Sequence, residues 1–236
     1  MTNRRRAAQG GSPATNYLMT AKSNPEVFAI CLEQGWCSAE GMTVADAADI
    51  TDIGTVFKGN RNIVQFDEFE YFGVSALSES AFSTCSSLVS ISFPDTLNSI
   101  PYRALYYCGA LTTVKFPDSL TIIRDNALEA SHIVDINLPD IGEINYKALA
   151  CAYAKTVTIG GQGATIKPYA LNLPVLEWMK ITTTNLSILG TNNIISSNAI
   201  IYVPDAQVND YKAAANWSAY ASQIKGLSEF VEPQAS

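Results

Sequence analysis

A short pattern of apolar residues recurs along the middle of the chain. Residues 81–94 read Ala-Phe-x-x-Cys-x-x-Leu-x-x-Ile-x-Phe-Pro, and residues 104–117 match this pattern at its apolar positions. The alternating segment at the end of each copy predicts a short strand, with two side chains pointing inward and one outward. The proline ends the strand because it lacks a donor for the next ladder hydrogen bond.

Weaker copies continue the pattern in both directions. The expected central strand residues are Phe66, Ile91, Val114, Ile136, Val157, Met179 and Ile201. Their separations of 25, 23, 22, 21, 22 and 22 residues are typical of leucine-rich repeats. The pattern therefore predicts an α/β repeat fold, a short leucine-rich-repeat solenoid with one parallel strand per repeat of about 22 residues.

The segment that joins one strand to the next is also patterned. Apolar anchors such as Leu97 and Ile100 follow a turn, and an Ala-Phe or Ala-Leu pair then begins the next copy. We expect these pairs to form a short helical or irregular edge. A single repeat cannot bury all these side chains alone, so its stability depends on its neighbours and on caps.

Both ends of the array show helix signals. Asn24-Pro25-Glu26 and the later Gly35 predict a helix from about 25 to 34, and a second short helix is expected from Thr43 to Asp49. Apolar residues at helical spacing after Asp205 predict a helix that covers the open last strand. The predicted organisation is a basic flexible arm at 1–22, a helical N-terminal cap at 23–56, repeats at 57–204, and a helical C-terminal cap and tail at 205–236.

Residues 60–230 resemble the BspA-like leucine-rich repeats of gut and oral bacteria. The complete copy at 81–94 and the ending Ile201-Tyr202-Val203-Pro204 carry the resemblance. The lead-in from Phe57 to Phe72 is similar to segments that precede such arrays in Bacteroidetes and their phages. The resemblance implies non-enzymatic binding, typically adhesion of bacterial surface proteins to host proteins, and related repeats in phage structural proteins.

Composition and charge narrow the range of partners. With 47% hydrophobic and 16% charged residues, the chain has the composition of a folded protein. Its net charge is −7, and because the first 22 residues hold four positive charges and no acid, the remainder sums to −11. An acidic body argues against nucleic-acid binding, which needs concentrated Lys and Arg. No apolar run is long enough for a membrane span or follows the first arginines as a secretory signal would, so neither is expected.

The basic leader has two interpretations. Arg4, Arg5 and Arg6 stand in an aperiodic segment rich in Gly, Ala and Thr, which predicts a disordered, solvated tail. The alternative is an attachment arm that orders when it docks on an acidic partner such as a capsid or tail surface.

The sequence shows no pattern typical of a catalytic or metal-binding site. The single histidine, His132, has no second His or Cys at metal-ligand spacing and is expected at the surface. The acids Asp46, Asp49 and Asp52 lack the spacing of a calcium loop, and the glycines at 160–163 predict a turn rather than a phosphate loop. We therefore expect no enzyme, no cofactor, no metal and no catalytic residue.

Three of the five cysteines occupy equivalent repeat positions. Cys85, Cys108 and Cys151 share one slot, which predicts a column of buried free thiols. Pairing of Cys31 with Cys37 stays an alternative, although all five are expected to be reduced.

The outward strand positions form the expected binding face. Seven strands about 4.8 Å apart give a face roughly 29 Å long, enough for a standard protein interface. Its candidate binding residues are Lys115, Asp135, Trp178, Lys180 and Tyr202. Trp178 beside Tyr202 is either an exposed anchor or packed against a cap. Tyr102, Tyr106 and Tyr107 at one edge either stack on sugars or protein, or simply pack.

Together these features predict a non-enzymatic protein-interaction module. We expect a phage virion component, such as a head or tail fibre or decoration protein, with virion proteins as partners. The alternative is an adhesin at the bacterial cell surface that binds a host protein or glycan. Oligomerisation within an assembly stays open.

Overall fold

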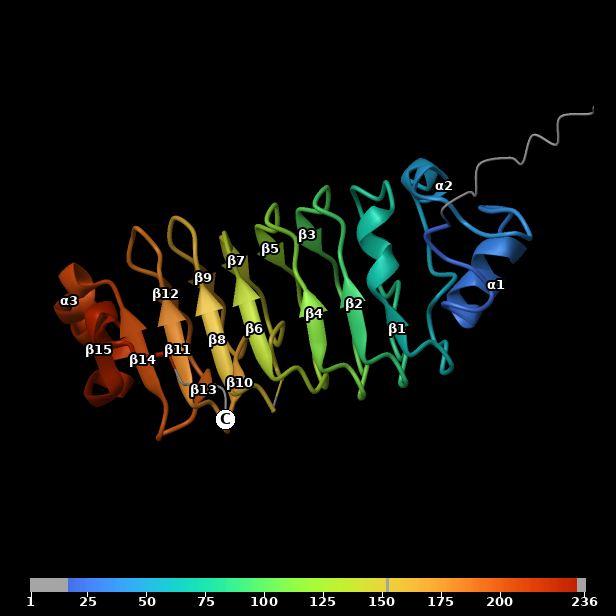
Figure 1. Cartoon of the computed structure of the whole chain (residues 1–236). Helices are drawn as coiled ribbons and strands as arrows, with labels where there is room; N and C mark the ends of the chain where they lie inside the picture. The colour runs from blue at the N-terminus through green and yellow to red at the C-terminus, as the bar shows by residue number, and fades with distance from the viewer. Residues whose placement is uncertain (1–16, 152, 233–236) are drawn as a thin grey trace, which may run out of the picture.

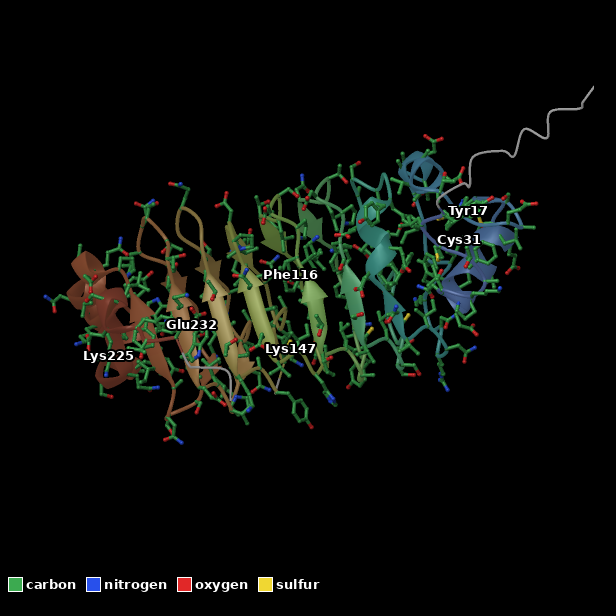
Figure 2. All side chains as sticks on the ribbon, in the orientation of Figure 1. Tyr17, Cys31, Phe116, Lys147, Lys225 and Glu232 are labelled. Atoms are coloured by element: carbon green, nitrogen blue, oxygen red, sulfur yellow. The ribbon has the colours of Figure 1, made fainter. Side chains whose placement is uncertain are left out.

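The computed structural model describes residues 17–151 and 153–232. Within this range the chain forms one elongated array of coils with helices at each end (Figure 1). Tyr17 and Cys31 lie at one end of the array and Lys225 at the other (Figure 2). The arginines of the predicted attachment arm, Arg4, Arg5 and Arg6, lie outside the described residues, so that arm stays a prediction.

One side of the array is made of the predicted strands, which together are called the first sheet. They run parallel and pair in the order of the chain. The pairing places Phe66 opposite Ile91 and Val157 opposite Met179, which confirms the predicted repeat. The strands form two blocks, because β4 and β6 do not pair with each other. The first block comprises β1 (Gln65–Phe66), β2 (Ser90–Ser92) and β4 (Thr113–Lys115), and the second begins with β6 (Asp135–Leu138), β8 (Thr156–Ile159), β11 (Trp178–Ile181) and β14 (Ile200–Val203).

A second parallel sheet lies on the next side of each coil. The expectation of one strand per repeat was therefore incomplete. The inward anchors of successive coils pair in register, as Ile100 does with Ile123 and Ile144 with Ile166, so the spacing that stacks the first strands also stacks these. The sheet comprises β3 (Ser99–Ile100), β5 (Ile122–Ile123), β7 (Glu143–Ile144), β9 (Thr165–Ile166) and β12 (Ile188–Leu189).

The third side of each coil is a run of turns that begins with the Ala-Phe or Ala-Leu pairs. Backbone hydrogen bonds join these turns between coils, as in Phe82 N–H to the Ala104 carbonyl and Leu105 N–H to the Ala127 carbonyl. Near the C-terminal end the turns become two short paired strands, β10 (Asn172–Leu173) and β13 (Ile194–Ile195). Each coil therefore has three sides around a core of stacked apolar columns.

Tight stacking explains the glycine that replaces a proline in the fourth copy. A Cβ at Gly160 would stand 2.1 Å from the Pro139 carbonyl oxygen of the coil before it, far inside van der Waals contact. The glycine segment forms the turn that the sequence predicted.

The N-terminal end of the core is aromatic. Phe57, Phe66, Phe69 and Phe82 are buried with ring centroids 5.0 to 6.2 Å apart. Phe69 belongs to η1 (Asp67–Tyr71), a short 3-10 helix that follows β1 directly. This cluster joins the first coil to the N-terminal cap, because Trp36 of the cap reaches Phe57 at 6.4 Å.

The predicted N-terminal helices are α1 (Pro25–Glu33) and α2 (Val44–Asp49). Thr43 and Asp46 form a reciprocal capping box at the start of α2. The Asn24 side-chain amide donates to the Gln65 carbonyl oxygen and to Glu68, which ties the start of α1 to the first coil.

The C-terminal cap differs from the prediction in one respect. Helical segments are present, but the edge of β14 is paired by a further strand, β15, through Ile201 opposite Ile224. Tyr211 and Trp217 of the cap are fully buried against the last coil. The cap comprises η2 (Asp205–Gln207), α3 (Val208–Ala213), η3 (Trp217–Gln223), β15 (Ile224–Gly226) and η4 (Leu227–Glu229). None of the described helices is long and apolar enough to cross a membrane.

Candidate functional site

The outward face of the first sheet carries the binding residues expected from the sequence. Lys115 on β4 and Asp135 on β6 are exposed, and each makes a contact along the face. Lys115 pairs with Glu70 of η1, while the Thr156 hydroxyl donates to Asp135 at 2.6 Å. These exposed contacts contribute little to stability and leave both charges available to a partner.

At the C-terminal end the face is covered by the tail. The Phe230 ring meets Trp178 at 5.2 Å and Tyr202 at 5.0 Å between centroids, both edge to face. The Lys180 ammonium lies 4.5 Å from the centroid of the same ring, within range of a cation–π contact. Tyr202 is buried as a result, and Trp178 is partly buried. Of the two interpretations of Trp178, the structure therefore shows packing against the C-terminal cap.

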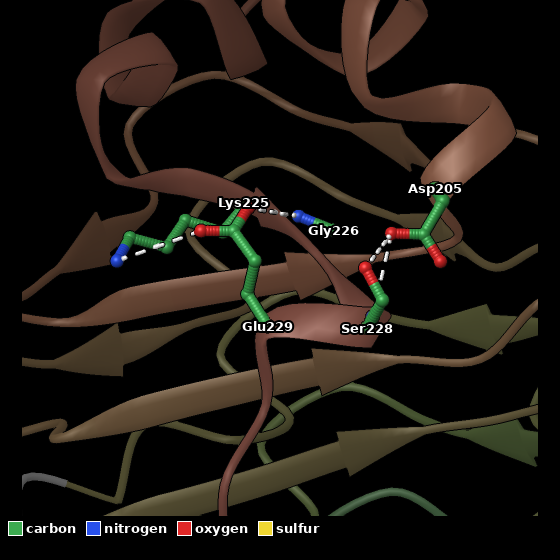
Figure 3. Close-up of polar contacts among 5 residues, drawn as sticks. All are labelled: Asp205, Lys225, Gly226, Ser228 and Glu229. Carbon is green, nitrogen blue, oxygen red and sulfur yellow. Dashed lines mark hydrogen bonds and ion pairs between the residues drawn. The ribbon is translucent and has the colours of Figure 1, made fainter.

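The turn before Phe230 is held by polar contacts (Figure 3). The Ser228 hydroxyl donates to Asp205 at 2.7 Å, and the Gly226 N–H donates to Glu229 at 3.2 Å. Lys225 and Glu229 form a loose ion pair at 3.9 Å. A Cβ at Gly226 would clash with the Asp205 carboxylate, so glycine permits the close approach that fixes the turn.

Beyond Phe230 the tail leaves a hollow on the face. It has a volume of about 440 Å³, and its lining comprises Val134, Asp135, Lys155, Thr156, Glu177, Trp178 and Glu232. Glu232 lies between Lys225 and the middle of the array (Figure 2). Lys155 pairs with Glu177 at 3.2 Å, with both side chains more than half exposed. The hollow carries charges of both signs beside one aromatic ring.

The structure gathers some of the candidate residues and separates others. Trp178, Lys180 and Tyr202 form one cluster, and Asp135 lines the hollow beside it. Lys115 lies apart on the first strand block, next to η1. The sequence analysis missed Phe230, although the only aromatic residue of the final segment after Tyr220 was a signal that it packs on the face.

The cysteine column is as predicted. Cys85, Cys108 and Cys151 are buried and free, and Cys31 is not paired with Cys37. The Cys108 thiol donates to the Phe82 carbonyl oxygen at 3.1 Å. Burial raises the pKa of Cys151 to about 12, and burial followed by the nearby Cys37 does the same for Cys31. Cys31 and Cys151 are therefore packing groups rather than nucleophiles.

The other titratable candidates lie at the surface. His132 is exposed, and its ring lies 4.1 Å from that of Tyr153 between centroids, with the two planes tilted by 54°. Within residues 17–151 and 153–232, no three His, Cys, Asp or Glu side chains gather closely enough to hold a metal ion.

The stacked coils and the open face define a leucine-rich-repeat solenoid. A family model described as BspA type Leucine rich repeat region, in six copies, matches residues 55–200. The chain belongs to this family. Such repeats mediate protein interactions and are typically non-enzymatic.

Among solved structures, the chain is similar to a leucine-rich repeat protein from Bacteroides ovatus. The sequence identity is 16% and the TM-score 0.40, over 74% of this chain and 63% of the other. The chain thus spans less than two thirds of that protein's length. No curated protein matches this chain.

Proposed function

We propose that the chain binds a protein partner through the outward face of its first sheet. The observation that carries the proposal is the hollow beside Trp178, where unlike charges and an aromatic ring meet. Aromatic anchors ringed by polar groups are typical of protein interfaces. A partner of this face presents side chains of both charges, because Lys155, Glu177 and Asp135 all line the hollow.

The proposed setting is a phage virion, with the chain as a head or tail fibre or decoration protein. What supports this is the similarity of the lead-in at residues 57–72 to segments found in Bacteroidetes and their phages. In this setting the arm with Arg4, Arg5 and Arg6 attaches the chain to the particle. The alternative proposal is an adhesin at the bacterial surface that binds a host protein or glycan.

The test of the binding face uses one photo-crosslinking residue at two matched positions. Thr158 on β8 and Thr165 on β9 belong to the same coil and are equally half-buried, but they lie on different sheets. The expected result is that position 158 crosslinks to a single protein and that position 165 crosslinks to none. Crosslinking from position 165 alone, or equally from both, contradicts the proposal.

The setting is tested separately. Mass spectrometry of purified phage particles is expected to detect the chain at a constant ratio to the capsid protein. Its absence from particles, together with its release by protease from intact bacteria, favours the adhesin alternative.

A further inference from the structure

A second recess lies on the third side of the solenoid, away from the proposed protein-binding face. It is a hollow of about 170 Å³ that spans the turns of several neighbouring coils. Ile194 contributes apolar surface to it, and this residue is half exposed although it belongs to strand β13. An isoleucine left open to solvent inside a recess offers apolar area to a ligand.

One wall of the hollow is an exposed aromatic ring. Tyr169 is about half exposed, and its ring meets that of Tyr146 at 5.7 Å with an angle of 65° between the planes. The contact with Tyr146 fixes the Tyr169 ring without covering it. A tyrosine held in this way supplies flat contact area at low conformational cost.

Among the described residues, the side-chain amides of the hollow have few hydrogen-bond partners. The Asn192 amide has a single long contact, to the Thr191 hydroxyl at 3.3 Å. Asn172 is the half-buried residue of β10, and both Asn172 and Tyr169 line the hollow. Amides and a phenol offer donors and acceptors together, which suits a ligand that carries hydroxyl groups.

Charge at the hollow is balanced. Lys147 and Glu129 both line it and form an ion pair at 2.9 Å, so the recess has no net charge to attract an anion or a cation. The Glu129 carboxylate also accepts from the Asn126 amide. A carboxylate oriented by two donors remains able to accept hydrogen bonds from neighbouring hydroxyls of a ligand.

We infer that this hollow binds one pyranose ring of a glycan. Its volume lies below the roughly 300–1,000 Å³ of pockets that enclose whole drug-sized ligands, so it fits a single ring of a longer molecule. The C–H face of a sugar packs on the Tyr169 ring, and its hydroxyls bond to Asn172, Asn192 and Glu129. A phosphate or a charged peptide end finds no complementary charge here. The inference does not rest on the proposed protein-binding function.

The test is a substitution of Tyr169 that suits the backbone conformation of this residue. Its φ is +58°, a left-handed conformation in which asparagine is well tolerated, so Tyr169→Asn removes the ring at little backbone cost. Tyr71→Asn is the control, because Tyr71 is similarly exposed and lies in η1, near the N-terminal end of the array and outside the hollow. Both variants are compared with the whole chain on an array of mammalian and bacterial glycans, followed by titration calorimetry with the bound oligosaccharides.

The whole chain is expected to bind a subset of glycans that share one terminal or internal pyranose. Tyr169→Asn should weaken this binding by up to about tenfold, as expected when one ring-stacking contact is removed, and Tyr71→Asn should leave it within about twofold. Failure of the whole chain to bind any array glycan overturns the inference. Equal effects of the two variants overturn it as well, whatever the result of the crosslinking at position 158.

Discussion

At the scale of the residue, the coil corners adopt a conformation that side chains disfavour. One corner of successive coils has a positive φ of 52° to 62°, and none of its residues is glycine: Ser80, Arg103, Asn126, Lys147, Tyr169 and Asn192. A second corner repeats this at Thr84, Tyr107 and Ala130. The left-handed region costs an L-residue roughly 1–2 kcal/mol, so the inter-coil hydrogen bonds of these turns offset a recurring strain.

The strain predicts a stabilising substitution. Ala130→Gly at φ +62° should raise the free energy of unfolding by about 0.5–1 kcal/mol, because relief of the left-handed cost exceeds the added chain entropy. The midpoint of urea denaturation measures the change. Ala110→Gly, at a turn position without positive φ, is the control and should lower the midpoint. A lower midpoint for Ala130→Gly would show that the corner carries no strain.

The different burial of the cysteines predicts the order in which they react with a thiol reagent. At pH 8, an aromatic disulfide reagent should label Cys37 first, because this is the partly exposed cysteine of the described chain. Even its reaction should be slow, since burial and then Asp46 raise the pKa of its thiol. Cys31 and Cys151, with pKa raised to about 12, stay protonated well above pH 8 and should react only on unfolding. Fast labelling that persists in Cys37→Ser would contradict this order.

At the scale of the element, the C-terminal cap binds both backbone groups of one serine in the last coil. The Ser187 N–H donates to the Tyr211 hydroxyl at 2.9 Å, and the Trp217 ring nitrogen donates to the Ser187 carbonyl at 2.7 Å. Both aromatic rings are fully buried. The cap thus satisfies the backbone groups that no further coil is present to pair.

Removal of one hydroxyl tests this arrangement. Tyr211→Phe leaves the buried Ser187 N–H without its partner and should cost about 1–3 kcal/mol of stability. Tyr220→Phe removes a comparable bond to the Asn193 carbonyl, but at a partly exposed site where water replaces the hydroxyl. The loss there should stay under about 1 kcal/mol. Thermal unfolding of both variants makes the comparison, and equal losses would exclude a special role for Ser187.

At the scale of the whole molecule, the tail returns across the sheet face and determines how much of it a partner reaches. Phe230 follows β15 closely in sequence, yet it contacts Trp178, Lys180 and Tyr202 on two earlier strands. The turn between Gly226 and Glu229 directs it there. Asp135 and Thr156, which line the hollow beside Trp178, lie outside this aromatic contact.

The cover over Trp178 predicts a fluorescence change. Phe230→Ala should shift Trp178 emission to longer wavelength and increase its quenching by acrylamide, because the ring that shields it is lost. The measurement is made in a Trp36→Phe background, which removes the emission of Trp36. The remaining Trp217 is fully buried and contributes a constant signal. Val231→Ala, at a side chain 82% exposed, is the control and should change nothing. An unchanged spectrum for Phe230→Ala would show that the tail does not cover Trp178 in solution.

The sequence by itself determined the period, the central residue of each strand and the N-terminal helices. These features depend on the short-range alternation of apolar and polar residues and on a repeat that aligns equivalent residues of successive coils. Phe66 therefore pairs with Ile91, and Met179 with Ile201. Burial of the cysteine column followed from the same repeat.

Only the tertiary structure decided the second sheet, the pairing of β15 and the place of Phe230. Two-residue strands such as Ile122–Ile123 are too short to show a local pattern and form because neighbouring coils align them. The contact of Phe230 with Trp178 joins a cap to a repeat, and no periodicity relates those two positions. Which candidate residues are open or covered is therefore a property of the folded chain.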